Sequence, residues 1–97
     1  MSTIYRSVTA NYTVDFAKDK VLLVDCTAGA VKITLPNALG TGGFNVNIVK
    51  IDTTENAVQV YSADNIEGNA SIYLSHIGNS IHVISDNSTY HLMGVGN

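Results

Sequence analysis

One phrase of the sequence occurs twice, within a chain that alternates apolar and polar residues almost throughout. Residues 24–33 (VDCTAGAVKI) are echoed by residues 51–60 (IDTTENAVQV), 27 residues further along. A two-residue alternation is typical of strands that bury one face, and Asp, Asn and Gly between such runs favour tight turns. Each copy therefore predicts a strand, a short polar turn and a returning strand, and the chain predicts an all-β fold.

The rest of the chain predicts eight or so short strands at regular spacing, which is typical of a sandwich or small barrel. Residues 15–20 are the one weak helix candidate, and residues 62–68 are expected to be turn-like. Because the phrase occurs only twice, we interpret it as paired hairpins rather than a solenoid. The expected fold is a small antiparallel β-sandwich or jelly-roll-like barrel, and periodicity leaves the strand order open.

The chain is expected to form one domain, residues 11–97, preceded by an N-terminal arm, residues 1–10. This arm has few core residues, and two alternatives stay open for it, a docking segment or an edge strand. Residues 21–24 are apolar on both faces, and residues 49–51 place an aliphatic side chain on either side of Lys50. We expect them to be covered by a second sheet or by a subunit contact. The predicted interface residues are Ile4, Tyr5, Val21, Leu23, Val49 and Ile51.

The composition favours self-association. Only 13% of the 97 residues are charged, about half the usual share, and a small β domain must protect its sheet edges. The net charge is −3, and the five Lys and Arg residues form no cluster. This argues against nucleic acid and against an anionic membrane surface as partners. No apolar segment is long enough to span a membrane, so we expect no membrane insertion.

The potential nucleophile and metal ligands are sparse. Cys26 is the single cysteine and lacks a recognisable catalytic context, although a histidine from elsewhere in the chain could reach it. His76, His82 and His91 form no local pair with metal-ligand spacing. A metal held by one histidine from each of three copies on a threefold axis remains an open alternative. We expect no metal, no cofactor and no catalytic residue.

Two further motifs are expected to be structural. Asp64 and Glu67 are close in sequence, but they lie in a turn-like stretch, and the chain has no Trp to line a sugar cleft. Residues 40–43 (GTGG) precede a strand pattern rather than the helix that a phosphate-binding loop requires. Sugar cleavage or sugar binding is therefore disfavoured, and the chain is predicted not to be an enzyme.

Short phrases follow one another along the chain in this order: NYTV at 11–14, VDCT at 24–27, VKITLP at 31–36, IVKID at 48–52, IEG at 66–68, GNSIHVISD at 78–86 and YHLMG at 90–94. Their order resembles the small β modules of tailed-bacteriophage virions, which occur in tail fibres and as head-fibre or capsid decoration proteins. The resemblance covers nearly the whole chain. It departs in the last hairpin, where Asn87 and Tyr90 stand where these modules often have Gly and Trp.

The resemblance implies a homotrimer in the virion, made in the bacterial host cytoplasm. The first expectation is a capsid decoration, or cement, protein that stabilises the head, because the chain starts with Met1 and shows a single module. The alternative is a tail-fibre or head-fibre knob that binds a host surface receptor. The expected partners are copies of the chain itself, the major capsid protein or another virion protein, and, under the alternative, a host surface glycan.

Overall fold

A computed structural model of the chain describes residues 5–96, which form nine β-strands and no helix. This part of the chain accordingly offers no helix capable of crossing a membrane. The strands are β1 (Tyr5–Val8), β2 (Tyr12–Thr13), β3 (Val21–Val24), β4 (Val31–Thr34), β5 (Asn45–Lys50), β6 (Val58–Ile66), β7 (Asn69–Leu74), β8 (Ser80–Ser85) and β9 (Tyr90–Gly96).

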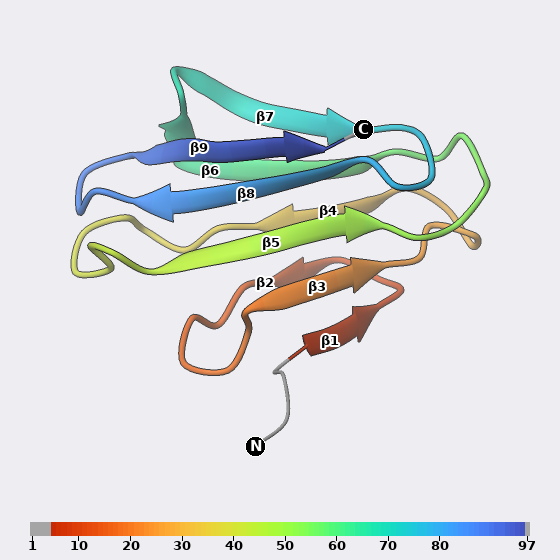
Figure 1. Cartoon of the computed structure of the whole chain (residues 1–97), viewed down its shortest axis with the longest axis horizontal. Coiled ribbons are helices and arrows are strands. Elements are labelled where there is room, and N and C mark those ends of the chain that lie inside the picture. The colour runs from red at the N-terminus through yellow and green to blue at the C-terminus, as the bar shows by residue number, and fades with distance from the viewer. Residues whose placement is uncertain (1–4, 97) are drawn as a thin grey trace.

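All nine strands belong to one sheet that folds back on itself (Figure 1). The strand order is β1-β3-β5-β8-β9-β6-β4-β2, and β7 is added beside β6. One layer contains β1, β3, β5 and β8, the other contains β2, β4, β6 and β7, and β9 links them. The sheet is barrel-like and nearly closed; it is not fully closed because the edge strands β1 and β2 are not paired with each other. The all-β prediction is confirmed.

The prediction of an antiparallel sheet made of paired hairpins is wrong. The two copies of the repeated phrase stack on each other in parallel, with Val24 paired to Lys50 in one layer and Val31 paired to Val58 in the other. The turn in each copy crosses between layers, which lie about 10 Å apart in stacked sheets. Alternation alone cannot separate this arrangement from a hairpin, because both bury every second residue.

The sheet is therefore mixed. The pairs β1–β3, β3–β5, β2–β4 and β4–β6 are parallel, and a short parallel bridge joins β6 to β9. The pairs β5–β8, β6–β7 and β8–β9 are antiparallel. The first two thirds of the chain thus form three stacked coils, each with one strand in each layer: β1 with β2, β3 with β4, and β5 with β6. The last three strands extend the two layers and join them at one end.

The core fills the space between the layers, and the sequence alternation assigns most of it correctly. Ile33, Val46, Ile81 and Val83 all point inward and are buried, as predicted from their alternation. Tyr90 is fully buried and its hydroxyl donates to the carbonyl of Pro36 at 2.7 Å. This contact satisfies the one polar atom of the largest buried side chain.

The stretch predicted to be turn-like, residues 62–68, is mostly strand, because β6 continues to Ile66 and only Glu67 and Gly68 form a turn. Its polar side chains bond within the fold: the hydroxyl of Ser62 accepts from the N–H of Asp64, and Asp64 accepts from the N–H of Ala38. The polar, turn-like residues of this stretch coincide with an irregularity in the β6–β7 pairing and with a positive φ at Asn65. Residues 15–20 form turns rather than a helix.

Residues 5–8 of the predicted arm form the edge strand β1, paired in parallel with β3. Buried Asp19 joins this strand to β2, because Arg6 Nε donates to it at 3.0 Å and the Tyr12 hydroxyl at 2.6 Å. Residues 1–4, which include the predicted interface residue Ile4, lie outside the described residues.

Candidate functional site

Four of the six predicted interface residues lie on one outer surface. The register pairs Tyr5 with Val21 and Leu23 with Val49, so these four side chains share the outside of the layer built from β1, β3, β5 and β8. We call this surface the front face. Its residues are Tyr5, Ser7, Val21, Leu23, Asn45, Asn47, Val49, Ser80, His82 and Ile84.

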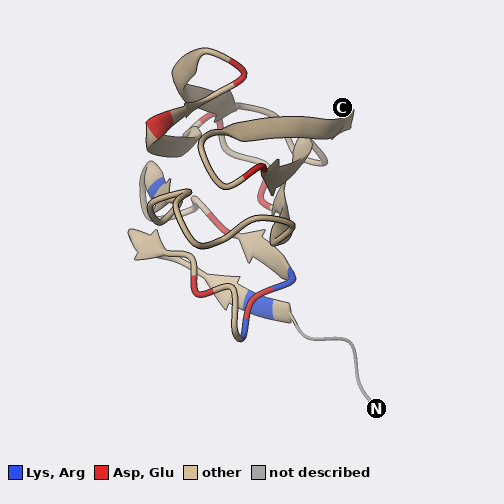
Figure 2. Cartoon of the chain, turned by 90° about the vertical axis from the view of Figure 1, so that its left-hand side faces the viewer, with Lys and Arg blue, Asp and Glu red and all other residues tan. Residues whose placement is uncertain are grey.

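None of the front-face residues is Asp, Glu, Lys or Arg. Val21, Leu23 and Val49 are half-buried within one chain, and Tyr5 is 61% exposed. Residues 5–96 form a single sheet, so this part of the chain provides no second sheet to cover them, which was one of the two ways in which we expected these strands to be buried. Figure 2 shows that most of the ribbon carries no charged residue and that the charged residues lie mainly in loops and near strand ends. The front face is therefore an uncharged, partly apolar surface.

Ile51 lies just past the end of β5 and is 42% exposed. Its backbone N–H donates to the carbonyl of Val24 at 2.9 Å, which holds it beside the front face. Sequence reasoning did not include Asn45, His82 and Ile84 in the interface. The alternation already placed Ile84 opposite buried Ile81 and Val83, but strand order was needed to bring β8 next to β5.

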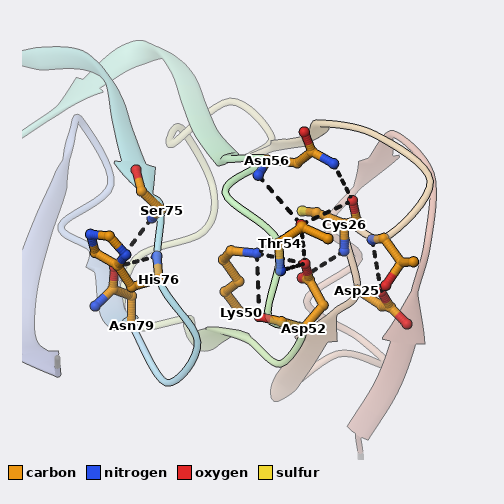
Figure 3. A network of polar contacts seen from close by, with 10 residues as sticks. Asp25, Cys26, Lys50, Asp52, Thr54, Asn56, Ser75, His76 and Asn79 are labelled. Carbon is orange, nitrogen blue, oxygen red and sulfur yellow. Dashed lines mark hydrogen bonds and ion pairs between the residues drawn. The ribbon is translucent and has the colours of Figure 1, made fainter.

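A fully buried ion pair lies at one end of the front layer, beneath the turns of the repeated phrase (Figure 3). Lys50 Nζ donates to Asp52 Oδ2 at 2.7 Å, and the backbone N–H of Cys26 donates to Asp52 Oδ1 at 2.7 Å. The N–H of Thr54 donates to Asp52 Oδ2 at 3.1 Å, and the hydroxyl of Thr54 donates to the same oxygen. Asn56 Nδ2 donates to the carbonyl of Cys26 at 2.9 Å.

Burial on its own raises the pKa of Asp52. The hydrogen bonds from Lys50, Thr54 and Cys26 outweigh this effect, so the pKa lies well below its usual range. Burial also raises the pKa of the Cys26 thiol, with a further contribution from the Asp52 carboxylate. Cys26 thus stays protonated at neutral pH in a fully buried position, where it lacks the thiolate that nucleophilic attack requires.

The repeated phrase uses its two aspartates differently. Asp52 is buried and reaches back to the N–H of Cys26, so it connects one coil to the coil stacked on it. Asp25, at the same place in the first copy, accepts from the N–H and hydroxyl of Thr27, two residues on. Asp25 is a local turn residue, as predicted, whereas Asp52 also fastens two coils together.

A second charged cluster lies on the surface where β9 meets β6 and β8. His91 Nδ1 lies 2.5 Å from Glu67 Oε1, and His91 Nε2 lies 2.7 Å from Asp86 Oδ2. The hydrogen bond to Asp86, followed by that to Glu67, raises the pKa of His91. The pKa of Asp86 is lowered to about 2 by the bond from His91 and by the N–H groups of Thr89 and Ser88. His91 therefore bridges two carboxylates, and both contacts favour its protonated form.

Both ring nitrogens of His91 are engaged by carboxylates, so this cluster does not present a set of converging ligands. Within residues 5–96, no group of three or more His, Cys, Asp or Glu side chains is arranged to hold a metal ion. Asp64 and Glu67, which the sequence disfavoured as a catalytic acid pair, have separate partners: Asp64 accepts from the N–H of Ala38, and Glu67 contacts His91.

An open depression of about 480 Å³ lies between the loop after β2 and the loops that precede β5. Its walls are mainly apolar, and the rings of Phe16 and Phe44 meet there with centroids 5.6 Å apart. Asp15 is the one charged residue among those that line it, and its Oδ1 accepts from the N–H of Ala17. The lining residues are Thr13, Val14, Asp15, Phe16, Ala17, Pro36, Thr41 and Phe44.

No protein-family model matches this chain, and the comparison with curated proteins finds no match. The function therefore has to be argued from the surfaces that the fold presents. The front face is the surface on which the predicted interface residues come together, and it is the candidate functional site.

Proposed function

We propose that this chain is a non-enzymatic structural protein of a bacteriophage virion that assembles as a homotrimer through its front face. The observation that carries the assembly is the front face itself, a flat row of half-buried aliphatic side chains without a charge. The virion role rests on the sequence resemblance described above. Within the virion, the proposal is a capsid decoration protein that bridges neighbouring subunits of the head.

The front face offers enough apolar surface to contribute to association. Burying a Val, Leu or Ile side chain completely stabilises by about 1.5–3 kcal/mol, and Val21, Leu23, Val49 and Ile84 are each already mostly buried within one chain. Completing their burial contributes about 2 kcal/mol per chain. In a closed ring of three copies, each chain contacts two others, so each chain gains burial at two contacts. The free energy gained at these contacts must offset the entropy lost on association.

The edges of the sheet support the same arrangement. Among residues 5–96, β1 pairs only with β3 and β2 only with β4, so each strand has one backbone edge without a strand partner in this part of the chain. Unpaired edges promote uncontrolled strand pairing unless something covers them. A trimer that places β1 near a neighbouring copy would cover both Tyr5 and this edge, and would hold three rigid β modules as one unit on the capsid.

The assembly is tested by sedimentation velocity on the parent chain and on two variants. We expect the parent to have three times the mass of the 10.3-kDa chain. Leu23→Asp, which puts a charge in the middle of the front face, should sediment as a folded monomer. Thr34→Asp, a matched change on the outside of the opposite layer, should leave the trimer intact. A monomeric parent, or a trimeric Leu23→Asp variant, would overturn the assembly proposal.

The place in the virion is tested by labelling intact particles with gold-conjugated antibodies against the chain. Label spread over the head supports capsid decoration. Label confined to the tail tip would replace decoration with the receptor-binding knob, and particles that carry no label would refute a virion role altogether.

A further inference from the structure

The outside of the opposite layer has a different chemistry from the front face. Lys32 and Thr34 alternate with buried residues on β4, so both side chains point outward. The register pairs Lys32 with Gln59 and Thr34 with Tyr61 across to β6. We call this surface the back face, and its residues are Lys32, Thr34, Gln59, Tyr61, Ser71 and Tyr73.

Two contacts link four of the back-face side chains to each other. Lys32 Nζ lies 4.4 Å from the centre of the Tyr61 ring, a cation–π contact. Gln59 Nε2 donates to the hydroxyl of Ser71 at 2.9 Å. Tyr73 is directly opposite Gln59 on β7 and is 60% exposed. The result is a grid of two tyrosine rings, one amide, two hydroxyl side chains and one ammonium group.

No back-face residue is aliphatic, which distinguishes this surface from the front face. Every side chain on it can form hydrogen bonds, and its apolar area belongs chiefly to the tyrosine rings and the stem of Lys32. A tyrosine ring offers a flat apolar surface together with a polar hydroxyl, and so suits a partner that is apolar in one part and wet in another. A pyranose ring has this character, because its C–H groups form an apolar face and its hydroxyls lie around the edge.

The charge on this surface indicates which class of ligand it would bind. Lys32 is the one charged residue of the back face, and no carboxylate of residues 5–96 forms an ion pair with it. An ammonium group held over a ring and left without a counter-charge is placed to receive an anion. A single cation is too few for the phosphate backbone of a nucleic acid, which needs several.

We propose that the back face binds an acidic carbohydrate, with a sugar ring stacked on Tyr73 and a carboxylate or sulfate group of the sugar on Lys32. Gln59 and Ser71 lie between these two positions and supply hydrogen bonds to ring hydroxyls. The absence of Trp made sugar binding disfavoured from the sequence, and here tyrosine rings supply the stacking surface instead. This inference goes beyond the assembly through the front face and does not depend on it, because the two surfaces lie on opposite layers of the sheet. It holds for a decoration protein and for a fibre knob alike.

The test is a titration of the whole, isotope-labelled chain followed by amide NMR shifts. The probes are a galacturonate hexasaccharide, which carries carboxylates, and a maltohexaose, which is neutral. We expect the acidic probe to shift the amides of β4, β6 and β7 and to bind more tightly than the neutral one. Tyr73→Ala should weaken the binding of both probes about tenfold. Lys32→Gln should weaken the binding of the acidic probe and leave the binding of the neutral probe unchanged.

Two controls keep this test separate from the trimer proposal. Tyr5→Ala removes an exposed tyrosine from the front face and should leave sugar binding unchanged. Leu23→Asp should also bind the sugar as the parent does, whether or not the parent is a trimer. The proposal is overturned by an absence of back-face shifts up to about 10 mM of either probe, the weak end of specific affinities. It is equally overturned by unchanged binding in Tyr73→Ala, or by a change of oligomeric state in that variant, which would assign the back face to a protein contact.

Discussion

Removing the carboxylate of Asp52 should cost this protein a large part of its stability. In Asp52→Ala the Lys50 ammonium, which is fully buried, keeps only distant oxygen partners, the Asp52 carbonyl at 3.4 Å and the Thr54 hydroxyl at 3.5 Å. The N–H of Cys26 loses its acceptor as well. Stranding one member of a buried ion pair costs about 3–5 kcal/mol, so we expect a loss of about 4 kcal/mol. A domain of this length is stable by about 5–15 kcal/mol in total.

Urea unfolding followed by circular dichroism measures this loss. With a slope of about 1.5 kcal/mol per molar urea, a loss of about 4 kcal/mol lowers the midpoint by about 2.5 M. The matched control is Asp25→Ala, at the same place in the other copy of the repeat. Asp25 bonds only within its own turn, so its removal should lower the midpoint by much less.

The double variant Lys50→Met/Asp52→Ala separates the stranded charge from the lost hydrogen bonds. Methionine fills similar space without an ammonium, so the double variant should be more stable than Asp52→Ala alone. Asp52→Asn provides a milder change should Asp52→Ala fail to fold, because the amide oxygen can still accept from Cys26. The argument from stranded charge is wrong if the free energy of unfolding of Asp52→Ala lies within about 0.5 kcal/mol of that of the parent. It is also wrong if the double variant is less stable than Asp52→Ala.

Two other perturbations address the surface. Because the pKa of folded His91 is raised, its bridge to Asp86 and Glu67 stabilises fully below the unfolded pKa of about 6.5 and is lost as pH rises through the folded value. Thermal melts across pH should therefore show His91→Gln less stable than the parent at pH 5 by a margin that shrinks towards alkaline pH; a constant margin would contradict this. Asn87 has φ +78° and accepts from the N–H of Gly40 at 2.7 Å, so Asn87→Val should lose about 2 kcal/mol in urea unfolding, with Asn87→Gly between it and the parent.

The alternation in the sequence predicted which residues point inward, because burial on one face leaves the same two-residue period in any sheet. Ile33, Val46 and Ile81 are buried in the structure as their alternation predicts. The same period does not record which strand is the neighbour. The parallel stacking of Val24 on Lys50 could not be distinguished from a hairpin, since the short turn between strands can either reverse within a layer or cross to the other.

The candidate site was predicted in part. Doubly apolar strands identified Val21, Leu23 and Val49 before their register was known, because outward aliphatic residues on short strands need a partner. Their convergence on one face could not be predicted, as it depends on strand order. The burial of Lys50 was missed, although it follows Val46 and Ile48 at two-residue spacing and so continues their inward face. A charge in an inward position was the signal that was overlooked.

The stacked coils also imply that the molecule does not open uniformly. β5 lies between β3 and β8, so its amides exchange with solvent only when a ladder on one side or the other separates. β1 has one neighbour and four paired residues, and it can detach while the rest of the sheet stays closed. Hydrogen exchange should then be fast at β1 and slow at β5 and β8 in an isolated chain. Tyr5 lies on the strand that opens most easily, so the proposed trimer should be detected most sensitively as slower hydrogen exchange at β1.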